Sequence, residues 1–363
     1  MIITINIGSS SARLGLHMND GKLCHLDHFD GGMQQSGMVD VLHQLAAHAR
    51  EGAIDAVCHR VVHGGPKFME TCFLEPEVEQ AIEKASSLAP LHNPPALRGI
   101  AAARKAFPKA LQLAAFDTGL YAALPDAAAH YAVPESLDVR RLGFHGLAHR
   151  SMLRLVKSCD TEGFAEKRAI SLQLGSGCSA TASRGGQAID TSMGHTPLEG
   201  LVMATRSGDI DPGLLLHVLG EKGRTAEAVE TLLSKQSGLL GISGRSADMR
   251  ELLELDDERA ELAVAMFCYR AKKYVGAYAA ALGGVDHIVF GGGIGENQSE
   301  IRHRILGGLD FLGVELDSRA NDAVVGRSGM ISSGRSAVRV DVCAVDENSL
   351  MAEDTAALMQ GSE

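Results

Sequence analysis

The 363-residue chain contains no tryptophan and only ten phenylalanines and five tyrosines. Aromatic side chains that could stack on successive bases are therefore scarce, which argues against a binder of single-stranded nucleic acid. Basic residues are also in deficit, because 34 Lys and Arg stand against 45 Asp and Glu. The resulting net charge of −11 argues against a general nucleic-acid partner, although a local basic pocket could still hold an anion.

Long apolar runs are also missing. No stretch approaches the roughly 18 apolar residues of a membrane-spanning helix, so we expect no membrane segment. The apolar start, Met1–Ile7, is short and lacks a basic leader, so we do not expect a signal peptide. An odd number of cysteines, seven, without a secretion signal favours reduced thiols and a cytoplasmic location.

Several motifs of known chemistry are absent. The cysteines form no CxxC pair, which excludes a zinc knuckle and a thioredoxin-like motif. No GxxxxGK[ST] sequence occurs, which excludes a P-loop. His145 and His149 have the i, i+4 spacing of a zinc pair, but neither an HExxH motif nor a third ligand accompanies them. We therefore reject a zinc site.

The segments that are present alternate between strand and helix patterns, which favours an α/β fold of about two domains. Apolar runs predict strands at 54–62, 111–116 and 286–290. Helical patterns lie at 38–50, 76–87, 95–107, 225–235, 246–255 and 259–282. Helix starts are expected at Asn93-Pro94, with Asn93 as the cap, at Asp211-Pro212, and at Asn297–Glu300, which has the spacing of a capped start.

One pattern occurs twice. The runs Ile2–Ile7 and Ala12–Leu16 flank a turn of glycine and serine, and Ala169–Leu174 leads into a second such turn, Gly175-Ser176-Gly177. Two such hairpins, each opening one half of the chain, indicate a duplicated domain. Backbone N–H groups and hydroxyls in these turns could bind phosphate oxygens, and the alternative is two ordinary tight hairpins.

Four further features allow a functional and a structural interpretation. Arg60, at the end of an apolar strand, and Arg206, in a polar turn, could bind carboxylate or phosphate, or form structural salt bridges. Asp117 directly follows a strand and could bind Mg²⁺ or be a solvated side chain. The glycine run Gly291–Gly295 could accept a base or ribose, or be a plain strand–helix turn.

Several long motifs in one order resemble those of the acetate kinase family, over nearly the whole chain. They are Asn6–Ser11, His59–Gly65, Leu88–Pro94, Phe116–Thr118, Gly143–Gly146, Asp190–Gly200, Thr205–Pro212, Ser237–Gly244 and Gly293–Asn297. The resemblance implies reversible transfer of a phosphoryl group from ATP to acetate, giving acetyl phosphate and ADP, with Mg²⁺ or Mn²⁺. It also implies a homodimer.

The implied fold is α/β, with two duplicated ribonuclease-H-like (actin-like ATPase) domains around a central cleft. We expect an N-terminal domain of residues 1–120, closed by a C-terminal helix at 349–363. The second domain, residues 121–348, would carry the nucleotide site and the dimer interface.

The resemblance also implies roles for individual residues. Arg60, Arg206, His145 and Asp117 would be catalytic, and Asn6 and Glu347 would hold the metal, with Asp117 helping to position it. The substrate methyl group would meet Val62, Leu91, Phe144 and Pro197, with Arg60 at the carboxylate. The nucleotide would be bound by Asn6, Arg13, Gln173, Gly175, Ser176, Gly177, Asp248, Met249, Arg250, Gly293, Ile294, Gly295 and Asn297.

The chain departs from the family pattern in the second glycine turn. Gln173 stands where His is usual, Ser176 where Asn is usual, and Arg13 replaces a Lys near the first hairpin. Loss of a basic donor at Gln173 predicts a weaker hold on the triphosphate. Propionate or butyrate kinase activity, or a weakened nucleotide-binding paralogue acting by interaction, remain the alternatives to acetate kinase activity.

Overall fold

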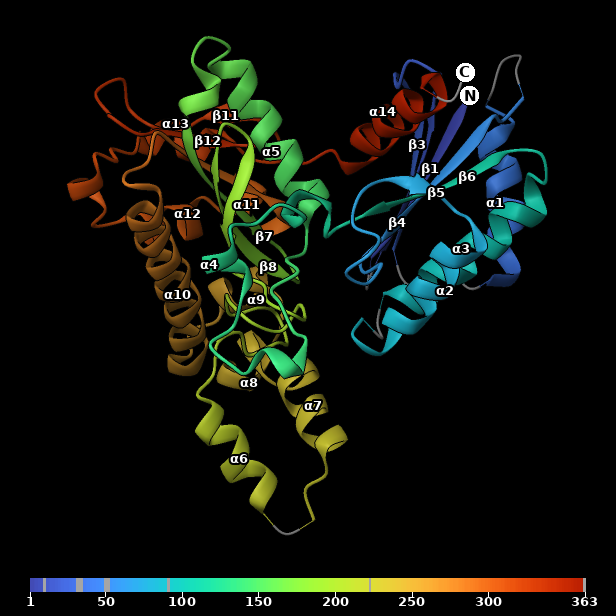
Figure 1. Cartoon of the computed structure of the whole chain (residues 1–363). Coiled ribbons are helices and arrows are strands. Elements are labelled where there is room, and N and C mark those ends of the chain that lie inside the picture. Colours follow the sequence, from blue (N-terminus) through green and yellow to red (C-terminus); the bar gives the residue numbers. More distant parts are fainter. Residues whose placement is uncertain (9–10, 31–34, 49–52, 90–91, 222, 362–363) are drawn as a thin grey trace. The chain divides into compact units, whose positions relative to one another are not determined.

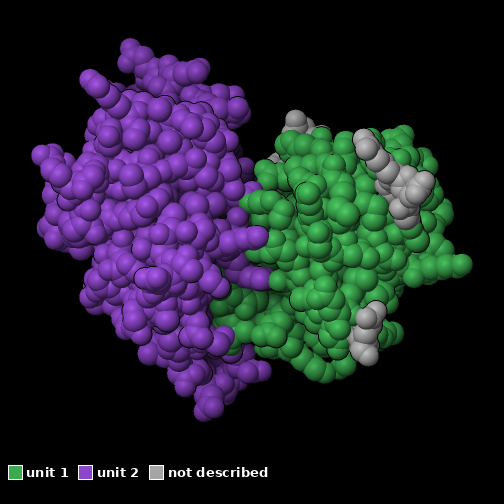
Figure 2. All heavy atoms as spheres, turned by 90° about the horizontal axis from the view of Figure 1, so that it is seen from above, with its two compact units in different colours: residues 1–122, 144–147, 346–363 green, residues 123–143, 148–345 purple. Residues whose placement is uncertain are grey.

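The computed structural model describes residues 1–363 except 9–10, 31–34, 49–52, 90–91, 222 and 362–363 (Figure 1). The chain divides into two compact units. Unit 1 contains residues 1–122, 144–147 and 346–363, and unit 2 contains residues 123–143 and 148–345 (Figure 2). Each unit has its own mixed sheet with helices against it. None of the described helices combines the length and apolarity needed to cross a membrane.

The described part of unit 1 contains a six-stranded sheet in the order β3-β2-β1-β4-β6-β5. β1 pairs with β2 as an antiparallel hairpin, and β4 pairs in parallel with both β1 and β6. The hairpin predicted at the start of the chain is therefore present. The strands are β1 (Ile2–Ile7), β2 (Ser11–His17), β3 (Leu23–Asp30), β4 (Ala56–Val61), β5 (Cys72–Phe73) and β6 (Leu111–Phe116).

Helices cover both faces of this sheet (Figure 1). Ile3, Ile5 and Ile7 of β1 share a core with helix α1, whereas Ile2 packs with Met351 of helix α14. Since successive strand side chains point to opposite faces, Thr4 and Asn6 lie on the α14 side. The helices are α1 (Gln35–Ala46), α2 (Pro76–Lys84), α3 (Asn93–Ala106) and α14 (Glu347–Gln360), with 3-10 turns η1 (Ala85–Ser87) and η2 (Gly119–Tyr121).

The sheet of unit 2 repeats the arrangement of unit 1. Its described strands have the order β9-β8-β7-β10-β12-β11, in which a hairpin is again followed by parallel neighbours. This matching order confirms the duplicated domain predicted from the two glycine turns. The strands are β7 (Arg168–Leu174), β8 (Cys178–Arg184), β9 (Gln187–Thr191), β10 (His287–Gly291), β11 (Gly329–Met330) and β12 (Arg339–Val342).

The longest described helix of unit 2, α10 (Glu258–Leu282), packs against α8 and β8. The other helices are α4 (Asp126–Ala129), α5 (Gly146–Cys159, whose first two residues belong to unit 1), α6 (Pro212–Gly220), α7 (Ala226–Lys235), α8 (Gly238–Ser243), α9 (Met249–Glu254), α11 (Gly292–Asn297), α12 (Ser299–Leu306) and α13 (Ser318–Ala323), with 3-10 turns η3 (Glu135–Leu137), η4 (Phe164–Glu166) and η5 (Asp310–Leu312).

Helices begin at all three predicted starts, since α3 begins at Asn93, α6 at Pro212 and α12 at Ser299, but two asparagines do not act as caps. Asn93 does not cap α3, because its amide donates to the carbonyls of His63 at 2.8 Å and Ile82 at 3.0 Å. Asn297 does not cap α12, because its amide donates to the Gly293 carbonyl at 2.9 Å. Asp211 does cap α6, by accepting from the Gly213 N–H at 2.9 Å.

Candidate active site

Three polar side chains gather at one edge of the unit 1 sheet. Asn6 lies near the end of β1, Arg60 near the end of β4, and Asp117 directly after β6. The carboxyl ends of these parallel strands meet at the same edge. Arg60 donates to both Asp117 carboxylate oxygens, at 3.0 Å from Nε and 2.7 Å from Nη2. Arg60 Nη1 donates to Asn6 Oδ1 at 3.1 Å.

Glu347 completes this group, which we call the Arg60 cluster (Asn6, Arg60, Asp117 and Glu347). Glu347 is the first residue of α14, where the helix dipole favours a negative charge. Its Oε2 accepts from Asn6 Nδ2 at 2.6 Å and lies 3.5 Å from Arg60 Nη1. The side chain of Asp117 is 1% exposed and that of Arg60 12% exposed, so the charges face each other with little solvent between them.

The charges of the Arg60 cluster depend on one another. Burial acting alone would lower the pKa of Arg60, but the negative charges of Asp117 and Glu347 outweigh it and raise that pKa above its ordinary value. Burial raises the pKa of Asp117, and the charge of Arg60 and its hydrogen bonds oppose this rise. Arg60 therefore keeps its positive charge throughout the physiological range.

His145 lies on a strained turn beside the Arg60 cluster. Its backbone φ is 59°, in the left-handed region that a residue with a Cβ enters at a cost of about 1–3 kcal/mol. Asp117 holds this turn, because its carboxylate accepts from the His145 backbone N–H and its carbonyl from the Gly146 N–H at 2.8 Å. A Cβ on Gly146 would lie 2.3 Å from the Asp117 carbonyl oxygen, so the close approach requires glycine there.

The residues predicted to meet the substrate methyl group are distributed over the chain. Val62 and Phe144 are buried in unit 1, and the Phe144 carbonyl accepts from the Tyr121 hydroxyl at 3.0 Å. Pro197 lies in unit 2. Leu91 lies outside the described residues.

Arg206, in unit 2, has quite different surroundings from Arg60. Its Nη1 donates to the Pro197 carbonyl at 2.6 Å, and no carboxylate pairs with it among the described residues. Burial lowers the pKa of Arg206. The Arg206 loop packs closely on Gly238, whose φ is +61° and whose Cβ, if present, would lie 2.7 Å from the Arg206 carbonyl oxygen. A partly buried cation without an acid partner is suited to binding an anion.

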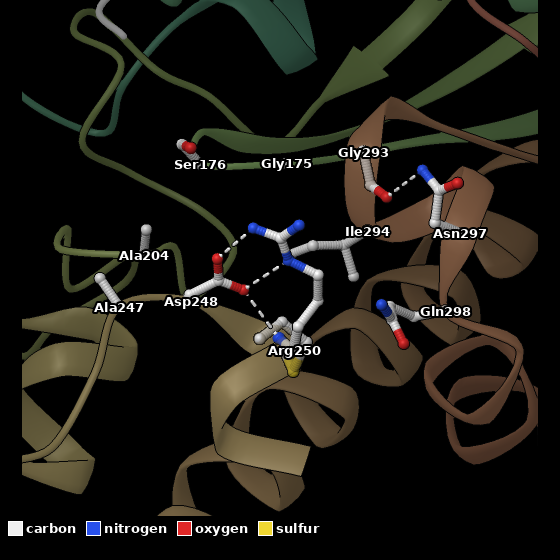
Figure 3. A pocket seen from close by; sticks show the side chains of 11 residues that line it. Gly175, Ser176, Ala204, Ala247, Asp248, Arg250, Gly293, Ile294, Asn297 and Gln298 are labelled. Carbon is white, nitrogen blue, oxygen red and sulfur yellow. Dashed lines mark hydrogen bonds and ion pairs between the residues drawn. The ribbon is translucent and has the colours of Figure 1, made fainter. Parts of the chain in front are cut away.

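A cavity of about 560 Å³ lies in unit 2, a size typical of a small-molecule site (Figure 3). It is bordered by the β7–β8 turn, by the start of α9 and by α11. The residues that line it are Gly175, Ser176, Ala204, Ala247, Asp248, Met249, Arg250, Gly293, Ile294, Asn297 and Gln298.

An ion pair lies inside this cavity. Asp248 caps α9 by accepting from the Arg250 N–H at 2.8 Å, and its carboxylate also accepts from the Arg250 guanidinium, at 2.6 Å from Nη2 (Figure 3). The hydrogen bonds from the Arg250 side chain lower the pKa of Asp248. The Arg250 side chain is 75% exposed, so its planar face is accessible to an aromatic ring.

Not all of the predicted nucleotide residues line this cavity. Asn6 and Arg13 belong to unit 1, where they face each other in the β1–β2 hairpin. Gly295 does not line the cavity but is buried beside β10, where a Cβ would lie in ordinary contact, 3.5 Å from the Cβ of Phe290. Gly177 closes the β7–β8 turn, since its carbonyl accepts from the Gly175 N–H at 3.1 Å.

Gln173 is not among the residues that line the cavity. A Cβ on Gly291 would lie 3.3 Å from Gln173 Oε1, and one on Gly292 would lie 2.9 Å from Gln173 Nε2, so the amide packs against the end of β10. Its Oε1 is buried and has no hydrogen-bond partner among the described residues. Gln173 is thus in contact with the strand end that leads into α11.

Sequence reasoning missed four residues. Ala204, Ala247 and Gln298 line the cavity but fall outside the family motifs found in the sequence. Asn348 donates to Thr4 Oγ1 at 2.8 Å and lies next to Glu347 in sequence. Its position beside a predicted metal residue was the one available signal.

The Arg60 cluster has donors that suit Mg²⁺. The ion prefers oxygen ligands and is usually held by one or two carboxylates plus waters and substrate phosphates. Asp117 and Glu347 supply two carboxylates and Asn6 an amide oxygen, and Glu347 Oε1 makes no hydrogen bond to the described residues. No group of three or more His, Cys, Asp or Glu that could enclose a metal occurs in the described part of the chain. The residues fit a metal held partly by substrate and water.

The family model of the acetokinase family matches residues 2–353. The chain belongs to the acetokinase family. Acetate kinase from Solibacter usitatus is 46% identical over 336 residues, covering 90% of this chain and 80% of the relative. The crystal structure of Porphyromonas gingivalis acetate kinase has a TM-score of 0.87 at 36% identity and covers 99% of both chains. A propionate kinase from Francisella tularensis also has a TM-score of 0.87, at 33% identity, with 97% and 98% coverage.

Proposed function

We propose that this acetokinase family member transfers the γ-phosphoryl group of ATP to acetate, reversibly, giving acetyl phosphate and ADP. A carboxylate oxygen attacks the γ-phosphorus, and the bond to the β,γ-bridging oxygen breaks as ADP leaves. Acetate is already a nucleophile, so no general base is required. The observation that carries the proposal is the buried Arg60 cluster. It places a permanent cation beside oxygen atoms that can bind a metal, at one edge of the sheet.

Cationic and hydrogen-bonding groups lower the barrier by screening the repulsion between the two anions. We assign Arg60 to the carboxylate, and Arg206 and His145 to charge on the phosphoryl group. Asp117 holds Arg60 in place through two hydrogen bonds and supports the His145 turn.

We further propose that Asn6 and Glu347 hold Mg²⁺ or Mn²⁺, with Asp117 positioning its waters. Bound metal would neutralise charge on the phosphate oxygens. ATP is assigned to the unit 2 cavity, with the adenosine between Arg250 and Gly293-Ile294 and the phosphates toward Gly175-Ser176.

An acyl phosphate assay tests the function directly. Purified protein is incubated with ATP, MgCl₂ and acetate, and acetyl phosphate is trapped as the hydroxamate. We expect product with metal and none in excess chelator, and the variant Arg206→Ala serves as the inactive control. Full activity in chelator would contradict the metal role, and no product from any short-chain acid would favour a nucleotide-binding paralogue.

Propionate is the second candidate acceptor, because a propionate kinase is among the similar structures. Val62, which is 5% exposed, is assigned to the acyl pocket. Val62→Ala removes about two methyl groups, so propionate should gain on acetate by about 1–2 kcal/mol in kcat/KM. The ratio is measured by the same assay with both acids. An unchanged ratio would place the acyl pocket elsewhere.

We also propose a cytoplasmic homodimer. The N-terminal actin-like domain would comprise residues 1–120 and the C-terminal segment 349–363, and the domain of residues 121–348 would carry the nucleotide site and the dimer interface. Exposed leucines support this interface: Leu214, Leu216 and Leu219 lie on α6, and none of the residues of that helix is buried.

A further inference from the structure

A chain of buried hydrogen bonds leads from the Arg60 cluster into the interior of unit 1. Asn6, whose Oδ1 accepts from Arg60, has its Nδ2 3.5 Å from Asn348 Oδ1. Asn348 Nδ2 donates to Thr4 Oγ1 at 2.8 Å. Thr4 Oγ1 lies 3.0 Å from His17 Nε2. The side chains of Thr4, His17 and Asn348 are buried, and the family motifs include none of these three residues.

The two end groups, the Arg60 guanidinium and the Gly21 carbonyl, fix the direction of every hydrogen bond between them. A guanidinium only donates, so Asn6 must present its oxygen to Arg60 and its N–H groups to Asn348 and Glu347. At the other end, His17 Nδ1 lies 3.2 Å from the Gly21 carbonyl, which only accepts, so Nδ1 carries the proton. Burial lowers the pKa of His17, so the ring is neutral and Nε2 accepts from the Thr4 hydroxyl.

The space for these hydrogen-bonded side chains depends on Gly15. A Cβ on Gly15 would lie 2.5 Å from His17 Nε2, 2.6 Å from Thr4 Oγ1 and 3.2 Å from Asn348 Nδ2. Thr4 faces Gly15 across the β1–β2 hairpin. Any side chain at this position would therefore displace the hydrogen-bonded groups, so the sequence of β2 leaves room for them.

We propose that Thr4 and Asn348 are positioning residues for Glu347 and Asn6, with His17 accepting the Thr4 O–H so that the hydroxyl oxygen is free to accept from Asn348. The bond from Asn348 to Thr4 joins the first turn of α14 to β1, one residue from Glu347 and two residues from Asn6. It thereby fixes where the Glu347 carboxylate and the Asn6 amide lie relative to Arg60. This inference rests on the proposed metal role of Asn6 and Glu347.

The variant Thr4→Val tests the proposal, because it keeps the shape of the side chain and removes the hydroxyl. Groups that orient metal-binding residues typically contribute 10–100-fold in affinity or activity. We expect the Mg²⁺ concentration for half-maximal activity to rise about tenfold. We also expect Mn²⁺ affinity in the presence of ADP, measured by electron paramagnetic resonance without turnover, to fall by a similar factor. Thr4→Ser, which keeps the hydroxyl, should restore both values.

Thr355→Val is the matched control. Thr355 is a fully buried threonine like Thr4, but it lies on α14, two turns after Glu347. Its hydroxyl donates to the Met351 carbonyl at 2.7 Å. This variant should leave both metal constants unchanged, whatever its melting temperature. If Thr4→Val does not fold, Asn348→Ser is measured in the same way.

Two results would overturn the proposal. One is a lower melting temperature for Thr4→Val with unchanged metal constants, which would make the role structural only. The other is an equal shift in Thr355→Val. An inactive wild type that still binds Mn²⁺ would contradict the proposed function instead, and the Mn²⁺ comparison between variants would still decide this inference.

Discussion

At the scale of single residues, Arg60 and Arg206 show how surroundings divide one residue type into two roles. Arg60 is paired with Asp117 and lies 3.5 Å from Glu347, so it also stabilises the fold of unit 1. Among the described residues, the Arg206 side chain donates only to a backbone carbonyl, that of Pro197. Sequence patterns identified both arginines but could not distinguish these surroundings, because the acids that pair with Arg60 are distant in sequence.

We predict that the two alanine variants separate stability from catalysis. Arg60→Ala leaves two buried acids without their cation and should lower the free energy of unfolding by about 3–5 kcal/mol. Arg206→Ala should leave the unfolding midpoint nearly unchanged and lower kcat at least about a hundredfold, the effect of losing one preorganised donor. Urea unfolding and hydroxamate kinetics measure the two quantities. Equal losses of stability in both variants would contradict this division.

At the scale of elements, the sequence predicted most helices and strands well, because their patterns are local. Helix α6 begins where Asp211-Pro212 indicated, since the Asp211 side chain caps it. Asn93 was assigned wrongly as a cap, because its partners, His63 and Ile82, come from other parts of the chain. Long-range hydrogen bonds of this kind leave no local pattern.

The helix α11 was also not predicted, since glycines at 292, 293 and 295 disfavour a helix locally. Tertiary packing overrides this preference, because α11 packs against β7 and β10 with Gly292 and Gly295 buried. Two neighbouring glycines of α11 differ in the room they leave for a side chain. Gly292 has a φ of +76° and no room for a Cβ, whereas a Cβ on Gly293 would meet no atom within 4 Å.

We predict that Gly293→Leu folds normally but excludes ATP, because its side chain enters the cavity assigned to adenosine. The KM for ATP should rise at least about tenfold, and the melting temperature should stay near that of the wild type. Gly292→Ala is the matched control and should melt at a lower temperature, since a Cβ would lie 2.6 Å from the Leu174 carbonyl oxygen. Unchanged ATP affinity in Gly293→Leu would move the adenosine elsewhere.

At the scale of the whole molecule, the duplicated hairpins were enough to predict two related sheets, and their strand orders agree. The sequence could not show which buried histidines each unit contains. Burial lowers the pKa of His59 in unit 1 to about 4 and that of His149 in unit 2 to about 3. His149 lies between Ser171 Oγ and Ser179 Oγ, each at 2.7 Å.

These histidines predict a loss of stability in acid. Below pH 6.5 the unfolded chain binds a proton at His59, while the folded chain does not until about pH 4, so stability falls as the pH decreases through this window. The loss from His59 amounts to about 3 kcal/mol. Urea unfolding at several pH values measures it, and His59→Gln should give a shallower slope between pH 6.5 and 4. An identical slope would show that His59 is already protonated in the folded protein.

The exposed leucines of α6 predict where two copies of the chain meet. Leu216 is 72% exposed, and Leu214 and Leu219 are 45% and 40% exposed on the same short helix. Exposed apolar patches of this kind are typical of protein interfaces, and the proposed homodimer would cover this one. Leu216→Glu would place a charge in that interface, so the dimer should dissociate at micromolar concentration, as measured by sedimentation velocity.

Leu111→Glu is the control, because Leu111 is an exposed leucine of β6 in unit 1, outside the proposed interface domain. A dimer that survives Leu216→Glu would mean that α6 is not part of the interface, and a monomeric wild type would contradict the homodimer itself.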